Sequence, residues 1–269
     1  MPKFSANLSM LFTELPFFRR FAAARAAGFS AVEYPFPYEH APATLAAQLD
    51  EHGLAQAIFN LPAGDWAAGD RGIACDPSWT VEFRAGVSRA VTYAKALRAP
   101  RLNCLAGIAP PGVGEDVLWN TLAENLRYAA DALAKEGLTL LVEFVNRKDI
   151  PGFYLHTSAQ TLRLIDDVGC PNLLMQYDVY HAQRAEGELA ATLRANMARI
   201  GHIQIADNPG RHQPGSGEIN FNFLLAEIDR LGYKGFVGLE YVPDPDTRAS
   251  LSWALRWGLS PGSSVASSK

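Results

Sequence analysis

Two glutamates interrupt segments that are otherwise almost entirely apolar. Glu143 lies in the segment 138–146, and Glu240 lies much further along the chain in the segment 236–242. An ionised carboxylate in an apolar interior costs several kcal/mol of stability unless an opposite charge offsets it. We therefore expect the two carboxylates to meet at a shared positive charge. A metal ion beside which chemistry takes place is the working hypothesis.

Strand-like and helix-like segments alternate along the whole chain, and they indicate how the glutamates are positioned. Apolar patterns predict strands at 3–10, 31–36, 54–61, 101–106, 138–146, 173–180, 201–206 and 235–242. Helical spacing with Pro or Gly near the ends predicts helices at 16–28, 42–53, 78–97, 115–136, 157–168, 188–200, 221–231 and 245–257. Strands that alternate with helices in this way pair in parallel through crossover connections.

Eight strand–helix units in 269 residues match an α/β fold of one domain, the (β/α)8 TIM barrel with parallel strands. We expect this domain to cover residues 1–259 and the Ser-rich segment 260–269 to be a frayed tail. An open doubly wound sheet is the alternative. That fold would require a Gly-rich phosphate turn after the first strand, and the residues at 9–12 include no glycine.

One oxygen donor lies near the end of each of the last four predicted strands. The active site of such a barrel lies at the C-terminal strand ends, where we place Glu143, Asp178, Gln204 and Glu240. Carboxylate and amide oxygens suit Mg²⁺, Mn²⁺ or Ca²⁺ better than zinc or copper. Three carboxylates around a divalent ion leave one excess negative charge, so an acidic substrate would need positive side chains nearby.

Two arginines are placed to supply that positive charge. Arg71 belongs to a long loop at 62–77, and Arg211 follows the seventh predicted strand. Loops of this length are often active-site lids, and this one also carries Trp66. A solvated excursion of the chain is the alternative for this loop.

Each candidate in the constellation also has a purely structural interpretation. Asp178 could brace its strand end, Gln204 could be a hydrogen-bonded core amide, and the nearby His181 could be a satisfied structural histidine. Glu33, in the second predicted strand, is equally compatible with the core and with the site. The regular placement of one donor per strand from the fifth to the eighth is the stronger signal.

Composition excludes several partners. The chain has 24 Lys and Arg against 28 Asp and Glu, a formal charge of −4, and no basic run, so no nucleic-acid partner is expected. It shows neither a secretory signal nor an apolar run long enough to span a membrane, so no membrane association is expected. The three cysteines lack zinc-site spacing and fit a reduced, cytoplasmic protein. The composition is compatible with a homo-oligomer.

Several long motifs resemble those of the hydroxypyruvate isomerase family, within the xylose isomerase-like and endonuclease IV-like barrel superfamily. The resemblance covers nearly the whole chain, and its motifs lie at 4–12, 60–69, 71–75, 150–153, 176–178 and 203–209. It implies that Glu143, Asp178, Gln204 and Glu240 bind a divalent metal, with Mg²⁺ or Mn²⁺ expected. Related sugar epimerases carry His where this chain has Gln204, which favours the hydroxypyruvate isomerase branch.

The resemblance also implies an activity. It predicts interconversion of hydroxypyruvate, a small anionic 2-oxo acid, with tartronate semialdehyde through an enediolate. Glu143 and Glu240 would transfer the proton, whereas His181, Arg211 and the loop residue Arg71 would contact the substrate. The closely similar 2-oxo-tetronate isomerases are the alternative within the branch. A DNA phosphodiesterase and a non-catalytic binding barrel are the alternatives from other classes.

Overall fold

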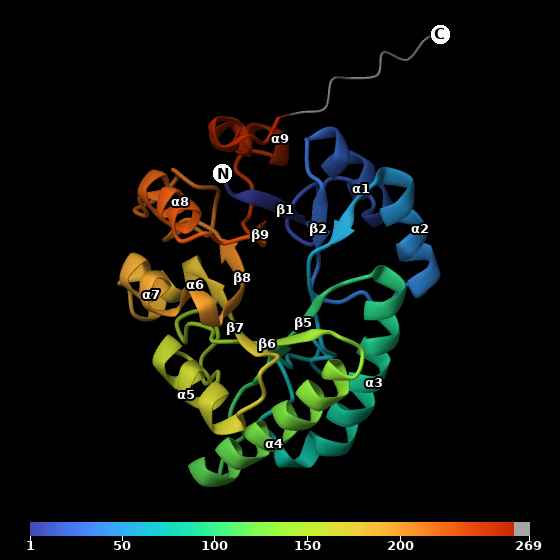
Figure 1. The fold of residues 1–269 in the computed structure, drawn as a ribbon, viewed down its shortest axis with the longest axis vertical. Coiled ribbons are helices and arrows are strands. Elements are labelled where there is room, and N and C mark those ends of the chain that lie inside the picture. The colour runs from blue at the N-terminus through green and yellow to red at the C-terminus, as the bar shows by residue number, and fades with distance from the viewer. Residues whose placement is uncertain (261–269) are drawn as a thin grey trace.

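The parallel strands form a nearly closed ring around the centre of the molecule (Figure 1). The computed structural model describes residues 1–260, so the predicted tail lies, except for its first residue, outside the described residues. The strands are β1 (Lys3–Asn7), β2 (Ala31–Glu33), β3 (Ala55–Gln56), β4 (Phe59–Asn60), β5 (Arg101–Leu105), β6 (Thr139–Glu143), β7 (Leu173–Asp178), β8 (Ile200–Ile205) and β9 (Phe236–Leu239). Their order, β3-β2-β1-β9-β8-β7-β6-β5-β4, confirms the predicted barrel.

The two ends of this ring, β3 and β4, are pieces of the single strand predicted at 54–61. The interruption falls at Ala57 and Ile58, where the Gln56 side-chain amide donates to the carbonyl of Ile58 at 2.8 Å. Before the break the chain pairs with β2, and after it the chain pairs with β5. The ring therefore has eight positions, and the third is split into β3 and β4.

Helices surround the ring (Figure 1). They are α1 (Phe17–Ala26), α2 (Pro42–His52), α3 (Thr80–Leu97), α4 (Glu115–Ala134), α5 (Ser158–Val168), α6 (Val179–Ala185), α7 (Leu189–Asn196), α8 (Phe221–Arg230) and α9 (Thr247–Ser250). Short 3₁₀ turns lie at Pro77–Trp79, Met197–Arg199 and Ser252–Trp257. The predicted final helix at 245–257 is therefore two short pieces, α9 and a 3₁₀ turn.

The helix α6 is absent from the sequence prediction, which extended the sixth strand to residue 180. Asp178 ends β7 and at once caps α6, because its Oδ1 accepts a hydrogen bond from the backbone N–H of Tyr180 at 2.8 Å. The chain passes from strand to helix without a loop. As a result, Tyr180 and His181 lie on a helix directly above the strand end.

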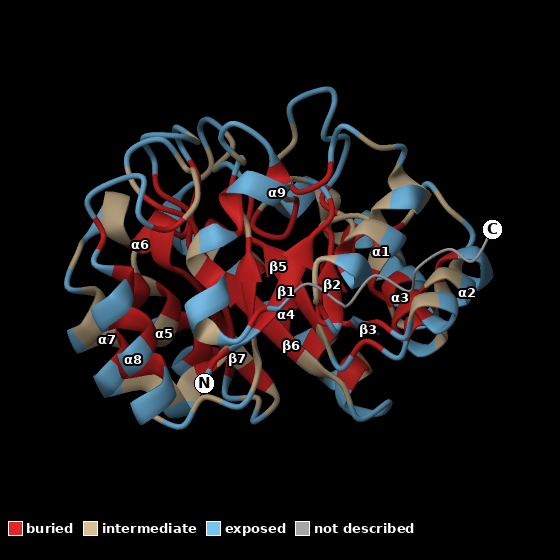
Figure 2. Ribbon diagram, turned by 90° about the horizontal axis from the view of Figure 1, so that it is seen from above, coloured by how far each residue is buried: buried red, intermediate tan, exposed pale blue. Residues whose placement is uncertain are grey.

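The core lies between the ring and the inner faces of the helices, which are red in Figure 2. On α4, for example, Leu118, Leu122, Leu126 and Leu133 are buried at helical spacing. Longer exposed loops gather at the top of Figure 2, on the side opposite the N-terminus. Within residues 1–260, no helix combines the length and the apolar character needed to cross a bilayer.

Candidate active site

A cavity of about 190 Å³ lies at the C-terminal ends of the strands. This volume is below the range of about 300–1,000 Å³ typical of sites for drug-sized ligands, so the cavity suits a small molecule. Six of the seven residues predicted for the site line it: Arg71, Glu143, His181, Gln204, Arg211 and Glu240. Asp178, the seventh, is 1% exposed and contacts this lining through Arg211 and His181.

The four predicted oxygen donors lie at or next to the C-terminal ends of four neighbouring strands. Glu143 and Asp178 are the last residues of β6 and β7, and Gln204 is the last but one of β8. In the strand register, Asp178 pairs with Gln204 and Glu143 pairs with Gln176. Glu240, predicted to lie inside the eighth strand, instead follows β9 directly, although its N–H still donates to the carbonyl of Ile205 at 3.2 Å.

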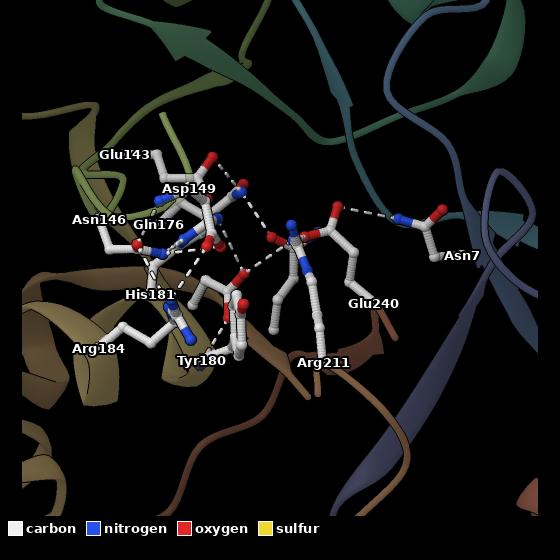
Figure 3. A network of polar contacts seen from close by, with 12 residues as sticks. Asn7, Glu143, Asn146, Asp149, Gln176, Tyr180, His181, Arg184, Arg211 and Glu240 are labelled. Carbon is white, nitrogen blue, oxygen red and sulfur yellow. Dashed lines mark hydrogen bonds and ion pairs between the residues drawn. The ribbon is translucent and has the colours of Figure 1, made fainter. Parts of the chain in front are cut away.

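Glu143 is held by two side-chain amides in an almost solvent-free position. Its Oε2 accepts hydrogen bonds from Nδ2 of Asn103 and Nε2 of Gln176, both at 2.9 Å. Figure 3 shows Glu143 and Gln176. Burial raises the pKa of Glu143 well above its ordinary range, and the nearby acids Glu240 and Asp178 raise it further. Two neutral donors therefore do not offset the cost of the buried charge.

Glu240 faces Glu143 across the cavity lining and has a different set of partners. Its Oε2 accepts from Nη2 of Arg211 at 2.7 Å, and its Oε1 accepts from Nδ2 of Asn7 at 3.1 Å (Figure 3). Burial raises the pKa of Glu240 to about 8, although Arg211 acts in the opposite direction and Asp178 adds to the rise. The guanidinium of Arg211 also lies 3.5 Å from Oδ2 of Asp178.

These carboxylates fit a divalent cation. Glu143, Asp178 and His181 each offer a possible ligand atom, and these atoms lie within 4.8 Å of one another. Burial and neighbouring acids, Asp178 among them, raise the pKa values of both glutamates, although the Arg211 guanidinium acts in the opposite direction. The three acids therefore outnumber the one guanidinium that contacts them. Oxygen-rich donor sets with such an excess of negative charge suit Mg²⁺ or Mn²⁺. Among His, Cys, Asp and Glu side chains, this compact cluster contains two of the predicted ligands, Glu143 and Asp178, together with His181.

Gln204 is tied into a chain of hydrogen bonds that the sequence did not predict. Its Oε1 accepts from Gln176 at 2.7 Å, and its Nε2 donates to Oε1 of Glu33 at 2.8 Å. Glu33 also accepts from Ser5 at 2.7 Å and contacts Nε2 of His202 at 3.0 Å. Glu33, which the sequence left open, therefore lies next to the site and orients the Gln204 amide.

Gly238 in β9 leaves space for the Glu33 carboxylate, and this glycine within a predicted strand could have indicated the close approach from the sequence. A Cβ atom at Gly238 would lie 2.4 Å from Oε1 of Glu33. Any other residue at this position of β9 would therefore displace the Glu33 carboxylate. A glycine inside a strand often marks such a close approach.

The long loop reaches the cavity with both residues that were predicted to cover a ligand. The Arg71 guanidinium stacks on the Trp66 ring at 4.3 Å and donates to the carbonyls of Trp66 and Asp70 at 3.1 and 2.7 Å. Gly72 anchors the loop in an antiparallel bridge to Ala106. Trp66 is 43% exposed, so it forms part of the cavity rim.

Comparison with known proteins agrees with this fold and site. The family model described as xylose isomerase-like TIM barrel matches residues 21–257. The chain belongs to this family.

Two curated members of the xylose isomerase-like family are similar to the chain over nearly their whole length. Hydroxypyruvate isomerase of Escherichia coli (strain K12) is 52% identical over 94% of this chain and 98% of the relative. A 2-oxo-tetronate isomerase of Cupriavidus necator is 46% identical over 94% of this chain and 97% of the relative. The family resemblance indicated by the sequence motifs is therefore confirmed.

Solved structures show the same barrel. The crystal structure of a protein named AP endonuclease, family 2, from Brucella melitensis superposes with a TM-score of 0.93 and 41% identity, over 96% of this chain and 99% of that one. A D-psicose 3-epimerase from Clostridium cellulolyticum H10 superposes with a TM-score of 0.78 at 16% identity, over 97% and 100% of the chains. The second similarity supports the fold alone.

Proposed function

We propose that this chain is an isomerase that interconverts hydroxypyruvate and tartronate semialdehyde by proton transfer through an enediolate. The main observation is the pair Glu143 and Glu240, a buried and a partly buried carboxylate that both have raised pKa values and line one small cavity. Groups that exchange protons in catalysis need pKa values near the working pH. The 52% identical relative that is named hydroxypyruvate isomerase supports the choice of substrate.

The residues that would hold a divalent ion are Glu143, Asp178, Gln204 and Glu240, with Mg²⁺ or Mn²⁺ as the expected metal. A bound ion would polarise the substrate carbonyl and stabilise the negative charge that develops next to it. Glu33 and Gln176 support this set, because they hold the amide of Gln204 from both sides.

The two glutamates share the proton transfer. One, in its ionised form, removes a proton from the hydroxyl-bearing carbon of hydroxypyruvate, and the other, in its protonated form, delivers a proton to the former carbonyl carbon. The hydroxyl hydrogen passes from its oxygen to the former carbonyl oxygen, so that the aldehyde and the new hydroxyl are both formed. Because the reaction is reversible, each residue takes the opposite role in the reverse direction. Their contacts differ, since Glu143 accepts from neutral amides and Glu240 also accepts from Arg211.

The acidic group of the substrate needs a positive partner. Arg211 and Arg71 both line the cavity, and His181 adds a polar ring to the lining, 3.6 Å from Asp178. Arg211 already contacts Glu240 and Asp178. Arg71 bonds to carbonyls of its own loop. Arg71 is therefore the better candidate for a new carboxylate partner, because its present contacts are neutral.

A 2-oxo-tetronate isomerase is the second candidate within the family, supported by the Cupriavidus necator relative. An endonuclease, suggested by the name of the Brucella melitensis protein, has less support. Phosphodiester hydrolysis on this type of barrel would require a His-rich site of several zinc ions and a basic surface. The ligand cluster found in residues 1–260 holds one histidine, and the formal charge of the chain is −4.

The three free cysteines fit the expected cytoplasmic location.

The test is a comparison of two substrates on metal-stripped and reloaded protein. We expect turnover of hydroxypyruvate that requires added Mg²⁺ or Mn²⁺, with a lower kcat/KM for 2-oxo-tetronates. The opposite preference would move the chain to the 2-oxo-tetronate branch. Inactivity on both, with either metal, would refute the proposal.

A further inference from the structure

Asn146 and His181 form a buried contact at the edge of the cavity. Asn146 follows β6 and is fully buried, and His181 lies in α6 with 4% of its surface exposed. Nδ2 of Asn146 lies 2.7 Å from Nδ1 of His181 (Figure 3). The position of the hydrogen depends on which atom of the Asn146 amide faces the ring.

The partners of Asn146 fix the orientation of its amide. One amide atom lies 3.1 and 3.0 Å from the backbone N–H groups of Lys148 and Asp149, and it must be the oxygen because N–H groups only donate. Nε of Arg184 also donates to this atom at 3.4 Å. The other amide atom lies 3.1 Å from the carboxylate oxygen Oδ2 of Asp149, which accepts, so this atom is the nitrogen.

We infer that Asn146 holds His181 as the neutral ring with its hydrogen on Nε2, so that His181 donates a hydrogen bond to the substrate and does not bind the metal. The Asn146 amide donates to Nδ1, and an accepting Nδ1 carries no hydrogen. The hydrogen is then on Nε2, where Oδ2 of Asp178 at 3.6 Å lies beyond hydrogen-bond distance. A ring nitrogen that carries hydrogen has no lone pair for a metal ion.

This assignment gives different roles to the three residues of the compact cluster, Glu143, Asp178 and His181. Glu143 and Asp178 remain as ligands, and His181 becomes a donor directed into the cavity. On the proposed function, its N–H would stabilise the negative charge that develops on the substrate oxygen, and the hydrogen would stay on the nitrogen. Asn146 is then a positioning residue, because it acts through His181.

Nitrogen-15 NMR of histidine-labelled protein tests the inference directly, with the His181 signals assigned from a His181→Gln variant. We expect hydrogen on Nε2 both without metal and with saturating Mg²⁺. His156 serves as the opposite reference, since its Nδ1 faces the carbonyl of Tyr154 at 3.1 Å. Hydrogen on Nδ1, or loss of the Nε2 hydrogen when Mg²⁺ is added, would overturn the inference.

An Asn146→Asp variant adds a functional readout. A carboxylate can only accept, so Nδ1 should gain hydrogen, and kcat for hydroxypyruvate should fall by about 10²- to 10³-fold. The control is Asn220→Asp, which introduces the same charge at the exposed cap of α8. Unchanged ring protonation and turnover in Asn146→Asp would contradict the inference.

The NMR measurement tests the tautomer of His181, and the activity measurement tests the proposed function, so either claim can be refuted without the other. The wild-type spectra decide the tautomer even where the variant does not fold. An Nε2–H ring in a protein inactive on 2-oxo acids would refute the proposed function and support the tautomer. An Nδ1–H ring in an active isomerase would support the proposed function and refute the tautomer.

Discussion

At the scale of single residues, the site consists of buried acids whose charge is only partly compensated. Glu143 meets two neutral amides, whereas Glu240 meets Arg211 and Asn7. Burial raises both pKa values, and neighbouring acids add to the rise, so that the pKa of Glu240 is about 8 and that of Glu143 lies well above its ordinary value. The partly compensated charge also fits the binding of a divalent cation.

Replacing either glutamate should abolish proton transfer and preserve the fold. Glu143→Gln and Glu240→Gln keep the side-chain volume, so we expect each to lower kcat by about 10²- to 10⁴-fold, the usual contribution of a general acid or base. Circular dichroism and thermal melting should show a native-like protein. Near-native turnover in either variant would disprove the role assigned to that glutamate.

The stability of the metal-free protein should depend on pH in a defined direction. Glu240 has a folded-state pKa of about 8 against an ordinary value of 4.5, so between these values the folded protein holds a proton that the unfolded chain releases. The free energy of unfolding then falls as pH rises through this window.

The measurement for this pH effect is a series of melting temperatures in EDTA from about pH 5 to 8. Glu240→Gln should reduce the slope without removing it, because the pKa of Glu143 is raised in the same direction. Added Mg²⁺, which competes with those protons, should stabilise the protein more at the higher pH. A stability that rises with pH in EDTA would contradict the account.

Glu33 should affect metal binding without touching the metal. Glu33→Ala removes the acceptor that orients the Gln204 amide, and loss of such a supporting contact typically weakens metal affinity by about 10- to 100-fold. Isothermal titration with Mn²⁺ measures the change. In a Gln204→Ala background, Glu33→Ala should lower the Mn²⁺ affinity little further. An equal loss of Mn²⁺ affinity in both backgrounds would show that Glu33 does not act by orienting the Gln204 amide.

At the scale of elements, strand ends place the site and loops complete it. The strand ends were predictable, because each carboxylate follows an apolar run. The split of the third strand and the helix α6 were not, since each coincides with a local side-chain hydrogen bond, from Gln56 and to Asp178, that no apolar pattern indicates. Glu33 and Asn146 also went unassigned, because their roles depend on residues that are distant in sequence or lie on other elements.

The loop after β8 carries Arg211 and is organised by one buried acid. Asp207 is fully buried and accepts from the backbone N–H groups of four loop residues at 2.8–3.0 Å: Asn208, Gly215, Gly217 and Ile219. The loop is also attached to the end of β9, because the N–H of Val242 donates to the carbonyl of Arg211 at 2.8 Å.

Asp207→Ala should therefore misplace Arg211. Hydrogen bonds to charged groups contribute about 1.5–3 kcal/mol each, so we expect faster proteolysis within 208–219 and a KM for hydroxypyruvate raised by about tenfold or more. Asp116→Ala, at an exposed position on α4, is the matched control. A KM equal to that of the control would show that Asp207 does not position the substrate site.

At the scale of the whole molecule, the barrel brings residues from both ends of the chain to one cavity. Asn7 in β1 and Glu240 after β9 are hydrogen-bonded although they lie 233 residues apart. The parallel ring closes through β1 and β9, and this closure lets eight short strands present their ends to one small ligand. The sequence predicted this closure from the number of strand–helix units, whereas side-chain orientations required the structure.

The most direct test of the central claim is the isomerisation of hydroxypyruvate in D₂O with Mg²⁺, followed by NMR at low conversion. Proton transfer through Glu143 and Glu240 predicts solvent deuterium on the carbon that was the carbonyl of hydroxypyruvate. The Glu143→Gln and Glu240→Gln variants should form product far more slowly. Complete transfer of the substrate's own hydrogen to that carbon, with no deuterium at any conversion, would contradict the account and indicate a hydride shift.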